Sequence, residues 1–144
     1  MIVASFADSP LLGHIARAIN DRDLDVLTAL FTEDLDSRQP VHPHRDFQGH
    51  DQIRRNWAAI FEGIPDLTAQ LVRSAINGDT VWAEWEWRGT RRDGQPHHTR
   101  GVTILGERDG RAAWVRFFME PVDRAGDDID GVIGHMTSST GGSR

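Results

Sequence analysis

Two histidines separated by a single residue, His42 and His44, are the first residues whose type and spacing could do chemistry. In an extended segment, residues two apart point to the same side, so one imidazole could act as a base and the other could orient it. Imidazole titrates near neutral pH, which suits removal of a proton next to a carbonyl group. The alternative is that both histidines face solvent in a turn around Pro43.

A metal site at these histidines would need a third ligand, which His50, His98 or Glu120 could supply. The pattern would then resemble a cupin, but Gln48 stands where the cupin glutamate would be. The chain has no cysteine and no tyrosine, and all 16 of its basic residues are arginine. Thiolate, phenol and Schiff-base chemistry are therefore excluded. We expect no metal and no other cofactor.

Two arginines occupy strand positions that are otherwise apolar. Arg100 and Arg116 share their strand faces with Val102, Ile104, Trp114 and Phe118. A buried guanidinium needs a carboxylate or a ligand anion, because its desolvation is costly. Glu120 is the nearest candidate, so the group is either a structural Arg–Glu pair or a clamp for a carboxylate or enolate. The predicted catalytic residues are His44, His42, Arg100, Arg116 and Glu120.

The chain contains five tryptophans, and several have the spacing of core residues. If the fold encloses a cavity, these tryptophans favour a flat, apolar ligand. The predicted ligand contacts are Trp57, Trp85, Trp87, His98, Val102 and Phe118.

These residues must be positioned by a sheet formed from residues 79–122. Apolar and polar residues alternate from Val81 to Arg88, which is typical of a half-buried strand. Asp93-Gly94 and Asp109-Gly110 predict the turns of two long hairpins. If each turn centres on its Asp-Gly pair, His98 lies near Glu120, Arg100 near Phe118 and Val102 near Arg116. This row of charged residues would then face whatever the sheet wraps around.

Helical patterns precede the sheet. Residues 10–20 follow the cap Ser9, residues 24–32 follow the cap Asp23, and residues 51–61 form a third helix. Residues 33–47 form a short strand or an irregular crossing, and residues 67–76 form a strand. The predicted fold is an α+β cone, a barrel-like domain of three N-terminal helices packed on a strongly curved antiparallel sheet of four strands. Its centre is either filled core or a closed pocket.

The order and spacing of several short motifs resemble the SnoaL-like branch of the nuclear transport factor 2-like superfamily. The motifs are residues 20–25 (NDRDLD), 30–34 (LFTED), 47–53 (FQGHDQI) and 109–111 (DGR) ahead of 114–120 (WVRFFME). The superfamily includes ketosteroid isomerase, limonene epoxide hydrolase, polyketide cyclases and proteins that only bind.

The resemblance carries over different catalytic residues from different members of the superfamily. Val102 stands where ketosteroid isomerase carries a protonated aspartate, so that mechanism is missing. Arg100 matches the bridging arginine of limonene epoxide hydrolase, but its two aspartates fall at Val102 and Arg116. Glu120 is the best match to the acidic residue that polyketide cyclases use late in the sheet.

The resulting hypothesis is a cofactor-independent enzyme of isomerase, cyclase or lyase type that does acid/base chemistry on a hydrophobic, carbonyl-bearing molecule; a hydrolase fits less well. The alternatives are a domain that binds a small molecule without catalysis and a dimeric structural domain with a filled cone. We expect a SnoaL-like domain over residues 1–122 and a partly disordered extension over residues 123–144.

Partners and location are also predicted. The net charge of −6 with scattered arginines argues against nucleic acid. No signal peptide or membrane span is visible in the sequence, so we expect a cytoplasmic protein without membrane contact. Trp82 falls on the outer face of the sheet between carboxylates, which favours a homodimer through that face.

Overall fold

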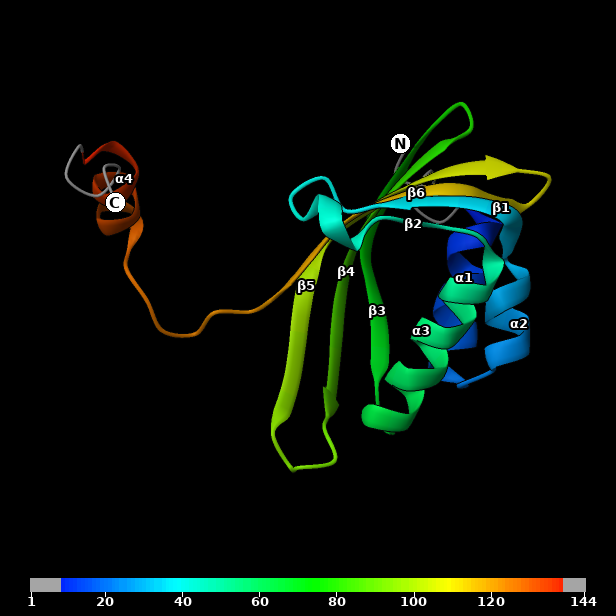
Figure 1. The fold of residues 1–144 in the computed structure, drawn as a ribbon, viewed down its shortest axis with the longest axis horizontal. Coiled ribbons are helices and arrows are strands. Elements are labelled where there is room, and N and C mark those ends of the chain that lie inside the picture. Colours follow the sequence, from blue (N-terminus) through cyan, green and yellow to red (C-terminus); the bar gives the residue numbers. More distant parts are fainter. Residues whose placement is uncertain (1–8, 139–144) are drawn as a thin grey trace.

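Three helices pack against one face of a curved six-stranded sheet in the computed structural model, which describes residues 9–138 (Figure 1). The predicted α+β cone is confirmed, and the N-terminal segment in which no signal peptide is expected lies mostly outside the described residues. The helices of the cone are α1 (Pro10–Asn20), α2 (Leu24–Ala29) and α3 (His50–Gly63). The strands are β1 (Phe31–Arg38), β2 (Phe47–Gln48), β3 (Thr68–Asn77), β4 (Thr80–Thr90), β5 (Pro96–Arg108) and β6 (Arg111–Pro121).

Both predicted helix caps are confirmed. Ser9 Oγ accepts a hydrogen bond from the Leu12 amide at 3.1 Å, and Asp23 Oδ1 accepts one from the Val26 amide at 3.1 Å. Each cap supplies an acceptor for an amide that has no partner within its own helix. The apolar stripe of α1 is buried, so the helix is fixed both by its cap and by the core beneath it.

The sheet contains more strands than the sequence predicts, and one pair of neighbours is parallel. The strand order is β2-β1-β6-β5-β4-β3, with β1 parallel to β6 and the other pairs antiparallel. The four predicted antiparallel strands are confirmed as β3 to β6, but the sequence prediction missed β2 and the parallel pairing of β1 with β6. Helix α2 ends at Ala29 rather than near Thr32, because Phe31 already begins β1. The acidic residues of β1 made this strand hard to recognise by alternation.

The hairpin between β5 and β6 has a register different from the predicted one. Arg100 lies opposite Glu120 and Val102 lies opposite Phe118. The expected neighbours of Glu120, Phe118 and Arg116 are therefore wrong. A bulge between Gly106 and Glu107 adds a residue to one strand, and bulges are not visible in a pattern of alternation.

The two faces of the sheet carry different residues. The inner face, covered by the helices, carries Trp85 and Trp87 of β4, which pair with Gly101 and Thr99 of β5. The alternate residues of β5 and β6 point to the opposite, outer face. These outer residues include His98, Arg100, Val102, Arg116, Phe118 and Glu120. The predicted row of charged residues thus faces away from the interior of the cone.

A separate helix follows the cone. After β6 an extended segment leads to α4 (Ile129–Thr137), which stands apart from the cone in Figure 1. Four of its apolar side chains, Ile129, Val132, Ile133 and Met136, are exposed. Among residues 9–138, none of the helices combines the length and the apolar character needed to cross a membrane.

Candidate functional site

A cavity of about 440 Å³ lies between the inner face of the sheet and helices α1 and α3. Aromatic rings form much of its wall: the ring centroids of Trp57 and Trp87 are 5.4 Å apart, and those of Trp87 and Phe117 are 6.0 Å apart. Of the two alternatives left open for the centre of the cone, a filled core and a pocket, the structure has the pocket. The lining residues are Ile15, Ile19, Phe31, Ser37, Gln39, Phe47, Ile53, Asn56, Trp57, Ala59, Ile60, Trp85, Trp87, Thr103, Leu105, Val115 and Phe117.

The cavity exists because bulky residues of β4 meet small residues of β5. Trp85 lies opposite Gly101, and the indole N–H of Trp85 donates to Thr103 Oγ1 at 2.9 Å. Gly101 has a φ of +155°, and a Cβ at this position would lie 2.0 Å from the carbonyl oxygen of Phe118. Only glycine therefore fits at this point of the β5–β6 pair. The hydrogen bond to Thr103 fixes the orientation of one wall ring.

The cavity wall is electrically neutral. No ionisable side chain is found among the described residues that line it. Four lining side chains carry a hydroxyl or amide group: Ser37, Gln39, Asn56 and Thr103. A charged ligand would lose its hydration here without gaining a counter-charge, so the cavity suits an uncharged molecule.

The structure divides the predicted ligand contacts between the two faces. Trp57, Trp85 and Trp87 line the cavity. The other three, His98, Val102 and Phe118, lie on the outer face, so their expected place at the cavity is wrong. The sequence misled because the outer face of β5 and β6 is itself rich in apolar residues.

The two predicted catalytic arginines are also on the outer face, and neither pairs with Glu120 as expected. The side chain of Arg100 is 49% exposed, and its nearest carboxylate is Glu84 at 3.9 Å. Arg116 lies 3.5 Å from Asp36. The expectation that Arg100 is buried is wrong, because this part of the outer face is open to solvent.

The remaining predicted catalytic residues meet where the loop between β1 and β2, which carries His42 and His44, approaches Glu120 at the end of β6. His42 Nε2 lies 2.9 Å from Glu120 Oε2, and the rings of His42 and His44 are 6.2 Å apart. The His42 amide donates to the carbonyl oxygen of Gln39 at 2.8 Å. Since Gln39 lines the cavity, this hydrogen bond links the His42–Glu120 pair to the rim of the cavity. His44 is exposed beside the pair.

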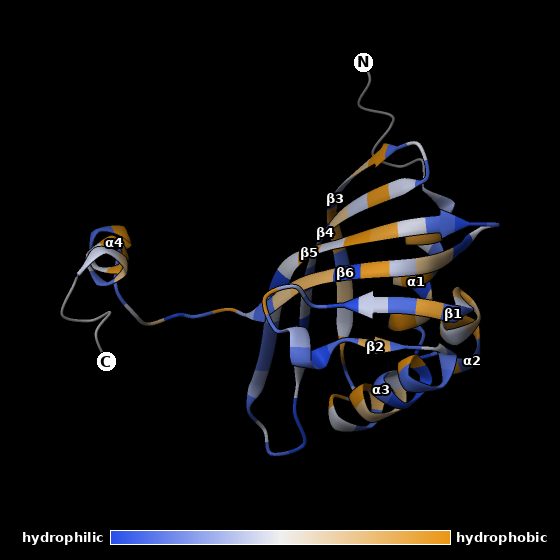
Figure 2. Ribbon diagram, turned by 45° about the horizontal axis from the view of Figure 1, so that its top comes forward, coloured by the Kyte–Doolittle hydropathy of each residue, from blue (hydrophilic) through white to orange (hydrophobic). Residues whose placement is uncertain are grey.

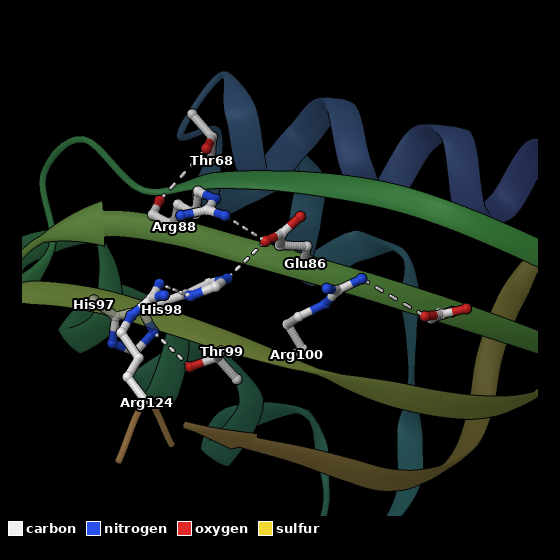
Figure 3. A network of polar contacts seen from close by, with 9 residues as sticks. Thr68, Glu86, Arg88, His97, His98, Thr99, Arg100 and Arg124 are labelled. Atoms are coloured by element: carbon white, nitrogen blue, oxygen red, sulfur yellow. Dashed lines mark hydrogen bonds and ion pairs between the residues drawn. The ribbon is translucent and has the colours of Figure 1, made fainter. Parts of the chain in front are cut away.

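A polar network on the outer face joins side chains of β4 and β5 with Arg124 (Figure 3). His98 Nε2 donates to Glu86 Oε2 at 2.6 Å, while His98 Nδ1 accepts from Arg124 at 2.6 Å. This arrangement requires a neutral His98 with its proton on Nε2. The hydrogen bond from His98 holds the pKa of Glu86 below its ordinary value, and Arg88, which donates to the same oxygen at 2.8 Å, acts in the same direction.

The neighbouring His97 belongs to a different environment. Its Nε2 lies 3.0 Å from the Thr99 hydroxyl, and burial, followed by the charge of Arg91, lowers the pKa of its imidazole. The hairpin that carries these histidines is mostly hydrophilic, as Figure 2 shows. This end of strands β4 and β5 is therefore suited to contact with solvent.

Of the residues proposed as a third metal ligand, His50 and His98 are engaged elsewhere, and only Glu120 lies beside His42. His50 Nε2 donates to the carbonyl oxygen of Thr28 at 2.8 Å, and His98 is engaged by Glu86. Within residues 9–138, no three His, Asp or Glu side chains are grouped so that they could hold a metal ion.

Sequence reasoning missed the polar residues of the cavity. Asn56 precedes Trp57 on α3, and Thr103 lies between two apolar residues of β5. Uncharged polar residues in such positions are common and carry no chemical signature of their own. The turn rule gave no signal for Thr103, because centring the hairpin on Asp93-Gly94 places it opposite Glu84 of the outer face, whereas the structure pairs it with Ala83.

Comparison with solved structures finds the same fold in several proteins of low sequence identity. IdmH from Streptomyces antibioticus, described as a candidate polyketide cyclase, is 20% identical, with a TM-score of 0.68 over 78% of this chain and 91% of that chain. A protein from Catenulispora acidiphila with a ketosteroid isomerase-like fold, solved with trimethylamine, is 18% identical, with a TM-score of 0.66 over 76% and 85% of the two chains. A candidate isomerase from Bacillus subtilis is 20% identical, with a TM-score of 0.68 over 76% and 84%.

Comparison with curated proteins finds no match. The family model for the SnoaL-like domain matches residues 12–139, which include α1 from Leu12 onward, α2, α3, the whole sheet and α4. The resemblance inferred from the motifs is therefore confirmed, and the fold is one shared by cyclase- and isomerase-like proteins. The chain belongs to the SnoaL-like domain family.

Proposed function

We propose that the cone cavity binds an uncharged, largely apolar small molecule and promotes its cyclisation or isomerisation. One observation carries this proposal: the cavity is walled by aromatic and aliphatic side chains, with no ionisable side chain among its described lining residues. Such a wall favours burial of an apolar ligand and penalises a charged one. The family membership of the chain supports the reaction class.

A neutral cavity can accelerate a ring closure by holding the substrate in a folded shape. Bringing two reacting groups of one molecule into contact removes much of the entropic part of the barrier. The rings of Trp57, Trp87 and Phe117 supply rigid surfaces for this purpose. In such an apolar site, a hydrogen bond to a carbonyl oxygen also has a larger effect than in water.

Proton transfer in this proposal falls to His42, which does not line the cavity itself but is hydrogen-bonded to Gln39 of its wall. Glu120, at the end of β6, is its orienting partner. Their contact of 2.9 Å and the link from His42 to Gln39 support this assignment. In a triketone, His42 would take a proton from the carbon between two carbonyls. The enolate oxygen would add to the far carbonyl carbon, and the oxygen of that carbonyl would take the proton back from His42. The resulting hydroxyl would leave as water with a hydrogen of the neighbouring CH₂ group, which completes the pyranone ring. Arg100 and Arg116 are assigned no step, because each lies beside a carboxylate other than Glu120, namely Glu84 and Asp36.

A second candidate function is binding without catalysis. The same observation favours it, because proton transfer normally uses an ionisable group in contact with the substrate. In this case the His42–Glu120 pair would only fix the loop between β1 and β2.

An aryl-capped triketone that cyclises to a diaryl pyranone distinguishes the two candidates. Binding is measured by the increase in melting temperature and turnover by the absorbance of the pyranone. We expect the protein to bind the triketone and speed the cyclisation, and His42→Gln to slow turnover by about a hundredfold with binding unchanged. The matched control is His44→Ala, which should keep the full rate. Binding without turnover would establish the second candidate, and absence of binding would overturn both.

A further inference from the structure

The amide of Asn56 has its orientation fixed by a relay of hydrogen bonds along α3. Arg55 Nη2 donates to Gln52 Oε1 at 2.6 Å, and a guanidinium can only donate. The oxygen of Gln52 must therefore face Arg55, which leaves its Nε2 to donate to Asn56 Oδ1 at 2.7 Å. Asn56 Oδ1 therefore already accepts a hydrogen bond, whereas the NH₂ group of Asn56 has no partner among the described residues.

Two other lining side chains have their oxygen atoms engaged in the same way. Gln39 Oε1 accepts from Arg45 at 3.3 Å, and Thr103 Oγ1 accepts from the indole of Trp85 at 2.9 Å. Among the described residues, no acceptor is bonded to Asn56 Nδ2, Gln39 Nε2 or the Thr103 hydroxyl proton. In these three of the four polar lining side chains, the oxygen already accepts a hydrogen bond while a donor has no partner among the described residues. The fourth, Ser37, can either donate or accept.

From this pattern we infer that the cavity selects uncharged, flat molecules that carry carbonyl acceptors, and that the relay through Arg55 and Gln52 sets this preference. The inference rests on the proposed function, because it takes the cavity to be the ligand site. A donor that a ligand leaves without a partner in an apolar site is costly. Sites built to hydrogen-bond a ligand therefore discriminate strongly against analogues that lack the matching group. Asn56 is the binding residue, and Gln52 is a positioning residue, since it does not line the cavity.

Three rigid tricyclic probes of nearly equal shape test the preference: fluorenone, which offers a carbonyl acceptor; fluorenol, which offers a hydroxyl; and fluorene, which has no polar group. Dissociation constants are measured by quenching of tryptophan fluorescence and checked by calorimetry. We expect fluorenone to bind about tenfold more tightly than fluorene, in the range of one good hydrogen bond. Asn56→Leu removes the donor while keeping a similar side-chain volume. In this variant the dissociation constant of fluorenone should equal that of fluorene.

The decisive variant is Gln52→Glu, which leaves every lining residue unchanged. The new carboxylate still accepts from Arg55 but cannot donate to Asn56. The Asn56 amide must then turn so that its NH₂ donates to the carboxylate and its oxygen faces the cavity. We expect the preference between fluorenone and fluorenol to reverse, because fluorenol can donate to that oxygen. If Gln52 had only a structural role, Gln52→Glu would weaken the binding of all three probes equally.

The matched control is Gln48→Glu, which adds the same charge near α3 at an exposed position without a link to Asn56. It should leave all three dissociation constants unchanged. Equal binding of the three probes to the unaltered protein would overturn the inference while the cavity stays the ligand site. An unchanged preference in Gln52→Glu would overturn the relay. Failure of all three probes to bind would contradict the proposed function, and the inference with it.

Discussion

The inner and outer faces of strands β4 to β6 are built from alternate residues of the same segments, yet they have opposite chemical character. The inner face, with Trp85, Trp87 and Phe117, lines a cavity whose described wall is neutral. The outer face carries Glu86 and His98 in a charged network, and its apolar residues are partly exposed. Apolar residues alone therefore do not identify the inner face. The residues that form the cavity are those on the face of the sheet that the helices cover.

This contrast also separates two kinds of chemistry. On the outer face, water screens the charges, so ion pairs such as Arg100–Glu84 contribute little to stability. Inside the cone, uncharged groups such as the Thr103 hydroxyl and the Asn56 amide act in an apolar environment, where each hydrogen bond has a larger effect. Selectivity for a ligand is thus expected from neutral residues rather than from the arginines.

The largest expected effect is a difference in stability between the two faces. Trp85 is 2% exposed, so Trp85→Ala should lower the free energy of unfolding by about 3–5 kcal/mol. Arg100→Ala, on the outer face of the adjacent strand, should lower it by less than about 0.5 kcal/mol. Urea unfolding followed by circular dichroism measures both values. Equal losses would show that the outer face contributes to the core as much as the cavity wall does.

The next effect concerns the acid stability of the outer network. The pKa of Glu86 is lowered from its ordinary value of 4.5, chiefly by the hydrogen bond from His98. The unfolded state therefore binds a proton more readily, so this contribution to stability is complete above pH 4.5 and is lost as the pH falls through the lower pKa of the folded state.

Glu86→Gln should accordingly flatten the dependence of the melting temperature on pH below about 4.5. Some dependence will persist, because the carboxyls of Asp34, Asp66 and Asp93 also have lowered pKa values. Calorimetric melting between pH 3 and 6 or so covers the window. Glu107→Gln is the control, since no imidazole contacts that carboxylate among the described residues. An identical pH profile in Glu86→Gln would rule out the His98 hydrogen bond as the cause.

The sequence predicted the parts of the fold that depend on local signals. Ser9 and Asp23 mark their helices because capping needs only a side-chain oxygen near the first turn. Asp93-Gly94 and Asp109-Gly110 mark their hairpins because Asp-Gly tolerates positive φ, which Asp109, Gly94 and Gly110 adopt. The parallel pairing of β1 with β6 joins segments distant in the chain, so no local pattern announces it.

The candidate site was predicted less well, for a related reason. The tryptophans Trp57, Trp85 and Trp87 were identified by type, and they do line the cavity. Arg100 and Arg116 were placed inside because their neighbours Val102, Ile104 and Phe118 are apolar, and the sequence does not say which apolar face the helices cover. The spacing of Gln52, Arg55 and Asn56 is visible in the sequence, but their relay matters only because Asn56 meets the cavity.

The smallest effect tests whether the outer face is an interface between two copies of the chain. Trp82 is 47% exposed, and with Ile104 and Trp114 it lines an outer groove of about 580 Å³. An exposed apolar patch of this kind favours association, and the same patch on a second copy is self-complementary around a two-fold axis. Arg116, whose guanidinium carbon lies 5.2 Å from the Trp114 ring centroid, and Asp36 supply matching charges at the edge of the groove.

We expect the protein to be a dimer and Trp82→Glu to raise its dissociation constant by about tenfold or more, because a carboxylate in the patch must be desolvated on association. Sedimentation velocity over a range of concentrations measures the constant. Val41→Glu introduces the same charge at a side chain that is 67% exposed in the loop between β1 and β2, so it should leave association unchanged. If Trp82→Glu also left the affinity for fluorenone unchanged, the two faces would be shown to act independently. A monomer at all concentrations would instead leave the apolar outer face without the partner that its composition predicts.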